Sequence, residues 1–532
     1  MWNGHPVYLR GNVQVEPLVD LWYAWSYLIP PHTAARNMTE RHMKIMDSYI
    51  AAPDVHAKAA TNPKLLGGPF MDFGGRKRVA EVRELREETK RKRSTLFALS
   101  EAIGTASELL RSQAKGFSLQ PLYPLLPEIL RGYVELVYDL NNNASLRLFE
   151  PLMYRSPSYD KSAQSLAFSL ITGDNRPFVL STPRLAAEGL VRADVAFSDS
   201  CVDDLFRMKK RPRRWSETRE MLGLSNEQAQ VFEGFLSEEP NPPYEKYEGN
   251  RVRWRYFGHA CILIETKSIS MLFDPVLSYT YDAGISRFTY DDLPDHIDYV
   301  VITHNHQDHV LLETLLQIRH KVGTVIVPRG GGSLQDPSLK LLLEAIGFRN
   351  VSEISEFQSI PFKDGEITGL PFLGEHSDLD VRSKLAYLVR MDRHSLLFAA
   401  DSCNIEPKLY EHVHNIVKDI DVLFLGMECD GAPLSWLYGP LLTQPLERRM
   451  DESRRLAGSN HDEGMDIVDR FKCREVYVYA MGQEPWLNHI MSLKYTAESR
   501  PITESNRLIE NCRQRNICAE RLFGEKEILL EP

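Results

Sequence analysis

The sequence predicts an α/β protein with two domains, an N-terminal domain of mixed α+β structure and a C-terminal αββα sandwich. Three observations predict this fold class. The chain of 532 residues is several times longer than a typical domain. The pattern of apolar residues changes near residue 245, and short apolar segments separated by turns follow that change. We therefore expect domains at residues 1–245 and 246–532.

The domain boundary is predicted by the segment 238–245, in which proline and acidic residues interrupt every periodic pattern. Helical periodicity dominates before it. Residues 79–93 are dense in alternating acidic and basic side chains, which is typical of an exposed helix with ion pairs between successive turns. Residues 21–31 contain four aromatic side chains and a double proline, a composition typical of a core or interface anchor.

The second half alternates short apolar strands with helices. Strands separated by a tight turn, as at 385–391 and 395–400, together with helices between other strands, predict two sheets faced by helices. The helices include residues 311–320 and 339–346. The expected strands are 253–257, 261–265, 270–273, 299–303, 324–327, 385–391, 395–400, 422–425 and 475–479.

Charge and composition exclude several classes of function. A formal net charge of −10 argues against a nucleic-acid partner, because non-specific binding depends on basic side chains that neutralise phosphates. No apolar run is long enough to cross a membrane and no leader pattern is evident, so we expect a cytoplasmic protein without a membrane partner. Seven cysteines without C-x-x-C spacing indicate neither a disulfide framework nor a zinc knuckle.

A cluster of metal-ligand side chains directly follows the apolar segment 299–302. It contains His304, His306, Asp308 and His309 within six residues. At the end of a strand, His304 and His306 point to the same side and can chelate one ion, because side chains alternate with period two. If the backbone then turns, Asp308 and His309 can reach a second ion, which gives a two-metal site able to activate water or dioxygen.

This H-x-H-x-D-H pattern resembles the signature of the metallo-β-lactamase superfamily, whose αββα fold agrees with the strand pattern. The superfamily takes further ligands from separate loops. Asp401 follows an apolar strand and fits a carboxylate that bridges two ions, and His461 fits the terminal histidine, with His489 as a competing candidate. Asp274 and His259 resemble supporting residues of the superfamily, which orient ligands rather than bind metal.

The third ligand of the first ion is ambiguous between two neighbours, Glu375 and His376. Adjacent side chains in an extended segment point to opposite sides, so only one of them is expected to bind. His376 would give a histidine-rich site suited to zinc and hydrolysis. Glu375 would give three carboxylates around two ions, a more anionic site suited to iron.

The whole chain is similar to a narrower family, the diiron β-hydroxylases of chloramphenicol biosynthesis. The similarity covers the aromatic and double-proline segment 22–31, the long N-terminal domain, residues 303–309, residues 374–376 and Asp401. It implies that His304, His306 and Glu375 bind one iron and that Asp308, His309 and His461 bind the other, with Asp401 as the bridge.

The same resemblance implies a dioxygen-dependent monooxygenase of antibiotic biosynthesis. Its substrate would be an amino acid tethered as a thioester to the carrier domain of a nonribosomal peptide synthetase and hydroxylated at the β-carbon. Glu375 and Asp401 would be the catalytic candidates. An electron donor is required, and the N-terminal domain would support a homodimer and docking of the synthetase.

Three other functions fit part of the sequence. A zinc hydrolase similar to the phospholipases that cleave N-acyl phosphatidylethanolamines would use His376 instead of Glu375. A nuclease is disfavoured by the acidic composition. A binding module with a structural metal is disfavoured because every ligand position is filled. The diiron monooxygenase is therefore the leading prediction and the zinc hydrolase the alternative.

Overall fold

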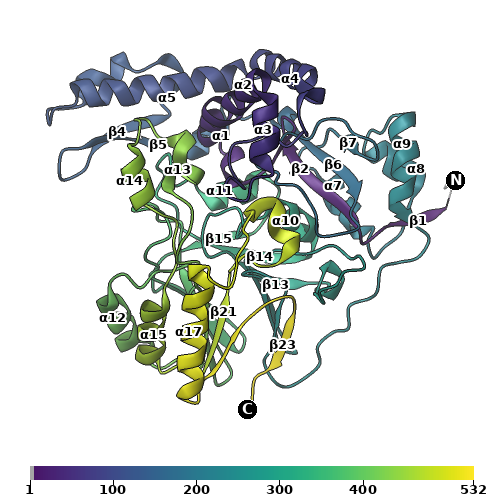
Figure 1. Cartoon of the computed structure of the whole chain (residues 1–532), viewed down its shortest axis with the longest axis vertical. Helices are drawn as coiled ribbons and strands as arrows, with labels where there is room; N and C mark the ends of the chain where they lie inside the picture. Colours follow the sequence, from purple (N-terminus) through teal and green to yellow (C-terminus); the bar gives the residue numbers. More distant parts are fainter. Residues whose placement is uncertain (1–4, 532) are drawn as a thin grey trace.

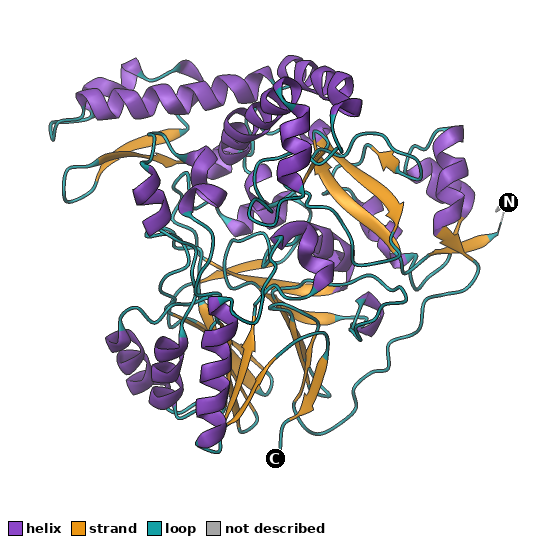
Figure 2. Cartoon of the chain, in the orientation of Figure 1, coloured by secondary structure: helices purple, strands orange, loops and turns teal. Residues whose placement is uncertain are grey.

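The structure is a computed structural model that describes residues 5–531. A helix-rich N-terminal part lies against a sandwich of two β-sheets (Figures 1 and 2). Among the described residues, no helix is both long and apolar enough to cross a membrane.

The N-terminal part combines small sheets with helices, as the α+β prediction requires. Its largest sheet has the order β3-β2-β6-β7, and a second sheet has the order β8-β1-β9. The strands are β1 Pro6–Leu9, β2 Val13–Val19, β3 Trp22–Tyr23, β4 Val134–Tyr138, β5 Ala144–Leu148, β6 Gln164–Leu170, β7 Val191–Ala193, β8 Arg213–Arg214 and β9 Leu236–Ser237. The helices are α1 Pro31–Asn37, α2 Met43–Ala51, α3 Pro53–Ala60, α4 Val79–Lys92, α5 Ser94–Gln113, α6 Glu150–Met153, α7 Ser200–Arg207, α8 Trp215–Met221 and α9 Asn226–Phe232.

The C-terminal part is the αββα sandwich that the sequence predicts. Each sheet has seven strands, in the orders β15-β14-β13-β12-β11-β10-β23 and β16-β17-β18-β19-β20-β21-β22. The first sheet contains β10 Arg253–Tyr256, β11 Ile262–Glu265, β12 Ser270–Phe273, β13 Ile297–Val301, β14 Val322–Pro328, β15 Val351–Ile354 and β23 Lys526–Leu529. The second contains β16 Ser359–Phe362, β17 Gly365–Leu370, β18 Ala386–Met391, β19 His394–Phe398, β20 Val422–Gly426, β21 Glu475–Tyr479 and β22 Cys518–Arg521.

Apolar cores lie between the two sheets and on the outer face of each sheet. Between the sheets, Phe273 stacks on Phe398 with ring centroids 3.8 Å apart, and Trp254 packs on Phe424. Apolar side chains of the outer helices α12 Pro407–Val417, α15 His461–Phe471 and α17 Arg500–Gln514 form a separate core with the second sheet. The remaining helices are α10 Leu312–Ile318, α11 Leu339–Ala345, α13 Leu434–Tyr438, α14 Arg448–Ser453 and α16 Asn488–Met491.

The N-terminal part packs on the other outer face, where its side chains share one continuous core with α10 and α11. A buried polar cluster joins the two parts. The carboxylate of Glu313 on α10 accepts hydrogen bonds from Tyr23 and from Arg176, and Arg176 also donates to Glu16. The aromatic segment 21–31 therefore anchors an interface inside the chain. Residues 238–252, around the predicted boundary, contain no helix or strand.

The nine strands predicted in the second half each correspond to a strand of the sandwich, shifted by at most two residues at either end. Five strands were not predicted. Four of these, β15, β16, β22 and β23, lie at the edges of the sheets, where half-exposed positions replace a continuous apolar pattern. The fifth, β17, contains two glycines and an acidic residue, which weaken the strand signal.

A buried carboxylate links stability to pH at the contact between the two parts. Glu150 at the start of α6 is 3% exposed and accepts the backbone N–H of Ser338. Burial raises the pKa of Glu150 to about 8. The nearest basic group is His32, 3.9 Å away, and burial lowers the pKa of that imidazole to about 3. Glu150 is therefore protonated in the folded protein at neutral pH.

Glu150→Gln should remove a pH dependence of stability. Because the folded pKa lies above the unfolded one, stabilisation by Glu150 is complete below pH 4.5 and is lost as pH rises towards about 8. The loss approaches about 1.4 kcal/mol per pH unit. Urea unfolding between pH 5 and 8 should show a flatter profile for Glu150→Gln than for wild type. Identical profiles for both, or the same flattening in the exposed control Glu101→Gln, would contradict the assignment.

Candidate metal centre

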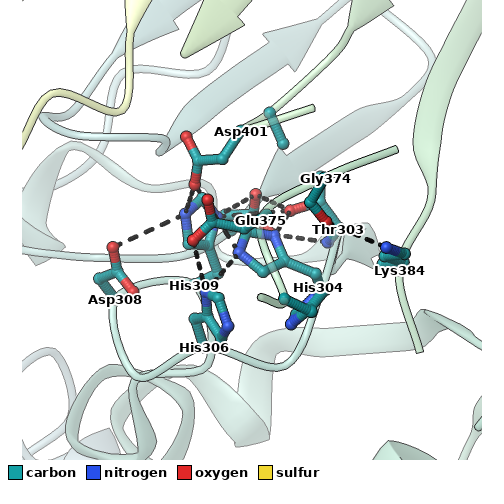
Figure 3. Close-up of polar contacts among 12 residues, drawn as sticks. Thr303, His304, His306, Asp308, His309, Gly374, Glu375, Lys384 and Asp401 are labelled. Atoms are coloured by element: carbon teal, nitrogen blue, oxygen red, sulfur yellow. Dashed lines mark hydrogen bonds and ion pairs between the residues drawn. The ribbon is translucent and has the colours of Figure 1, made fainter. Parts of the chain in front are cut away.

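Loops at the ends of three strands bring six of the predicted ligands together at one edge of the sandwich (Figure 3). The loop after β13 contains His304, His306, Asp308 and His309, and Asp401 follows β19. Glu375 lies on the connection between β17 and β18. Neighbouring parallel strands, such as β12 and β13, end at the same edge, so residues far apart in sequence converge there.

One group of possible ligand atoms consists of His304, His306 and Glu375. His306 Nδ1 lies 3.0 Å from Glu375 Oε1 and 3.1 Å from His304 Nε2. All three side chains are at least nine-tenths buried. Two imidazole nitrogens and a carboxylate oxygen at this separation can bind one divalent ion.

A second group contains Asp308, His309 and Asp401. His309 Nε2 lies 2.9 Å from Asp401 Oδ2 and 3.8 Å from Asp308 Oδ2. Asp401 Oδ2 is also 3.7 Å from His304 Nε2, so this carboxylate faces both groups, as expected of a bridge. Gly426 at the end of β20 leaves room for it, because a side chain there would collide with Asp401 Oδ1.

Hydrogen bonds fix which nitrogen each histidine offers to a metal. Asp274 is fully buried and accepts from His309 Nδ1 at 2.8 Å and from the Thr303 hydroxyl at 2.6 Å. Because the Thr303 hydroxyl donates to Asp274, its oxygen accepts from His304 Nδ1 at 3.0 Å. Both imidazoles therefore present Nε2 to the centre. Asp274 lies in the supporting position predicted for it.

His259 also lies beside the centre, where its Nε2 is 3.0 Å from Asp308 Oδ2. The three atoms of His259, Asp308 and His309 are close enough to hold an ion. However, the backbone N–H of Gly482 donates to His259 Nδ1. Nε2 must then carry the proton and donate to Asp308. We infer that His259 orients Asp308 and does not bind metal.

The backbone around Glu375 decides between the two neighbouring candidates. Gly374 and Glu375 both have positive φ, 77° and 65°, so the chain is not extended here and Glu375 turns towards His306. Lys384 Nζ donates to the Gly374 carbonyl at 3.0 Å and stabilises this turn (Figure 3). His376 Nδ1 instead forms a 2.7 Å hydrogen bond with the Tyr438 hydroxyl. Glu375, and not His376, belongs to a ligand group among the described residues.

The structure does not bring His461 to the centre, so this predicted ligand needs correction. His461 is the first residue of α15, where its ring bonds Asp462 at 2.7 Å and Asn511 of α17 at 2.7 Å. The competing candidate, His489, bonds the Trp486 carbonyl instead. Three histidines and three carboxylates remain at the centre.

The donor set fits two cations. Burial, together with Asp401 and Asp308, raises the pKa of Glu375 well above its usual value when no cation balances these carboxylates. Asp401 Oδ1 is buried and has no hydrogen-bond partner in the described part of the chain. Metal ions would compensate the clustered negative charge, and Asp401 Oδ1 could then bind a metal ion.

A cavity of about 310 Å³ lies over the centre and includes Asp308, Glu375 and Asp401 in its wall. Glu428, Asp430, Trp436 and Arg455 are among the other wall residues. The sequence carries no signal that marks these wall residues, nor Lys384 or Tyr438, as part of the site. They belong to no local motif, and only the folded chain places them beside the ligands.

The fold and the centre together define a class: a metallo-β-lactamase-fold protein with a buried dinuclear metal site rich in carboxylates. Comparison with known proteins is more specific. Residues 8–240 match the family described as the diiron non-heme beta-hydroxylase N-terminal domain, and residues 270–432 match the beta-lactamase superfamily domain. The protein is 41% identical over 533 aligned residues to a Streptomyces venezuelae enzyme, covering 98% of this chain and 99% of the relative. That relative is named 4-amino-L-phenylalanyl-[CmlP-peptidyl-carrier-protein] 3-hydroxylase.

Solved structures agree over the same length. The crystal structure of CmlA, a diiron β-hydroxylase from Streptomyces venezuelae, superposes with a TM-score of 0.93 at 39% identity and covers 99% of both chains. A Glu-to-Asp variant of that β-hydroxylase gives a TM-score of 0.91, covering 98% of this chain and all of the other. The chain belongs to the diiron β-hydroxylase family. The predicted fold, the enzyme class and the two-iron cofactor are confirmed, and the zinc hydrolase alternative is not favoured.

Proposed function

We propose that this enzyme hydroxylates the β-carbon of an amino acid carried as a thioester on the carrier domain of a nonribosomal peptide synthetase. The relative from Streptomyces venezuelae supports this substrate class, because its name specifies an aminoacyl group on a peptidyl carrier protein and hydroxylation at carbon 3. The match over nearly the full length of both chains supports the same mode of substrate delivery.

In this proposal, His304, His306 and Glu375 would hold one iron, Asp308 and His309 would hold the other, and Asp401, which faces both groups, would contribute to both. The observation that carries the proposal is the turn at Gly374 and Glu375, which places a carboxylate next to His306. Three carboxylates make the site anionic, which favours iron over a histidine-rich zinc site. When bound, the two irons supply the activation of dioxygen.

Several residues that do not bind metal hold the proposed ligands in position. Asp274 and Thr303 hold the imidazoles of His304 and His309 in one orientation, and His259 holds Asp308. The Lys384 ammonium keeps the Glu375 turn in place. The cavity over the centre is partly enclosed, so a bound substrate would displace water from the reacting carbon.

The specific carrier domain, the electron donor, the homodimer and the cytoplasmic location remain predictions from the sequence. A carrier-bound substrate does require an open path from the surface to the metal centre, and the cavity at Trp436 provides the inner end of such a path.

Iron content and hydroxylation test the proposed function together. The protein purified without added metal should contain about two irons per chain, with near-ultraviolet absorption that bleaches on reduction and returns with oxygen. The reduced enzyme should add one oxygen atom to an aminoacyl carrier domain, detected by mass spectrometry as an ¹⁸O-labelled product from ¹⁸O₂. Two zincs per chain, or hydrolysis of the thioester without oxygen incorporation, would contradict the proposal.

A further inference from the structure

A second cavity adjoins the one over the metal centre. This side cavity has a volume of about 220 Å³ and is lined by the loop that follows α3, by residues near 175 and by the end of α16. Leu66, Gly67 and Ser492 line both cavities. The two cavities are therefore neighbours that meet at these three residues, which we call the shared wall.

One residue of the shared wall, Gly67, has no side chain. Gly67 has φ +74° and lies between Ser492 and Trp436, where an added Cβ would be 3.5 Å from Ser492 Cβ and 3.5 Å from Trp436 Nε1. The indole N–H of Trp436 donates to the Gly67 carbonyl at 3.0 Å and holds the loop in this position. A larger residue at 67 would place its side chain against Ser492 and Trp436, where the two cavities meet.

The side cavity is lined by both apolar and polar groups. Leu65, Leu66 and Phe70 supply apolar surface, and Asn175, Asn488 and Lys494 supply polar groups. In the part of the chain that the structure describes, the side chains of these three polar residues form no hydrogen bond or ion pair. Asp174 in the same wall is already paired with Arg287 at 2.7 Å. Asn488 is half-buried, and Asn175 and Lys494 are exposed, so two amides and an ammonium are accessible to a ligand at this cavity.

We propose that the side cavity binds the phosphopantetheine arm of the carrier domain. This inference rests on the proposed function and specifies how its substrate enters. The arm contains two amides, a branched apolar segment and a terminal phosphate. Asn175 and Asn488 match the amides, Leu65 and Phe70 match the apolar segment, and the Lys494 ammonium matches the phosphate. The thioester then passes Gly67, and the amino acid occupies the cavity over the metal centre.

Inhibition by fragments of the arm tests the phosphate contact. Phosphopantetheine and pantetheine differ only in the phosphate, and both should compete with an aminoacyl carrier domain during hydroxylation. The inhibition constant of wild type should be about fivefold lower for phosphopantetheine. Lys494→Glu should abolish this preference, whereas Lys363→Glu, in the turn between β16 and β17, should retain it. Absence of inhibition by either compound, or a preference retained in Lys494→Glu, would overturn the proposal.

A larger side chain at position 67 tests whether the thioester passes between the two cavities there. Asparagine tolerates positive φ, so Gly67→Asn should fold and retain iron and its optical spectrum. Its kcat/KM for the aminoacyl carrier domain should fall about a hundredfold, because displacing a tethered substrate by an ångström costs that much. Turnover equal to wild type would exclude passage at Gly67. A wild-type enzyme that fails to hydroxylate the aminoacyl carrier domain would instead contradict the proposed function, whatever these variants do.

Discussion

Glu375→Ala is expected to abolish hydroxylation and to release iron from the site formed with His304 and His306. Glu375 supplies the only carboxylate of that group, and its Oε1 lies 3.0 Å from His306 Nδ1. Loss of a residue that merely orients a ligand already lowers metal affinity by about 10- to 100-fold, so loss of a ligand should cost more. Iron content by mass spectrometry and product formation in a single turnover measure both effects.

His376→Ala is the matched control, because it removes the neighbouring side chain. His376 bonds Tyr438 and lies outside the ligand groups of the described residues, so the variant should keep its iron and most of its activity. A metal-free His376→Ala combined with an iron-loaded, active Glu375→Ala would reverse the assignment. That result would restore the histidine-rich site of a zinc hydrolase.

Asp401→Asn should have an equally large effect, because Asp401 faces both groups of ligands. Its Oδ2 lies 2.9 Å from His309 Nε2 and 3.7 Å from His304 Nε2, and its Oδ1 is buried without a hydrogen-bond partner. Asparagine preserves the shape but supplies one neutral oxygen instead of a carboxylate. Iron content should fall from about two to below about one per chain, and the optical bands of a bridged pair should disappear.

His461→Ala provides the control for the second site. His461 bonds Asp462 and Asn511 rather than the metal ligands, so its loss should leave iron content and spectrum unchanged. Loss of one iron in His461→Ala would show that α15 moves towards the centre in the metal-bound enzyme, and it would restore the original assignment of this residue.

Local sequence was sufficient to predict metal ligands where several of them lie in one short segment. The four ligand candidates between residues 304 and 309 follow a buried strand, and strand alternation alone predicts that two of them share a face. The central strands of the sandwich were predictable for a similar reason. They are buried on both faces, so each is a short apolar segment, whereas the half-exposed edge strands carry no such signal.

The sequence by itself determined the αββα architecture, the two-metal motif and the resemblance to the diiron β-hydroxylases. Only the tertiary structure distinguished Glu375 from His376, because the choice depends on positive φ angles and on a hydrogen bond from Lys384, which is nine residues away in sequence. It also placed His461 beside Asn511 rather than beside the other predicted ligands, and His259 beside Asp308. Ligands from separate loops are selected by the positions of strand ends in space, and no local pattern of residues encodes those positions.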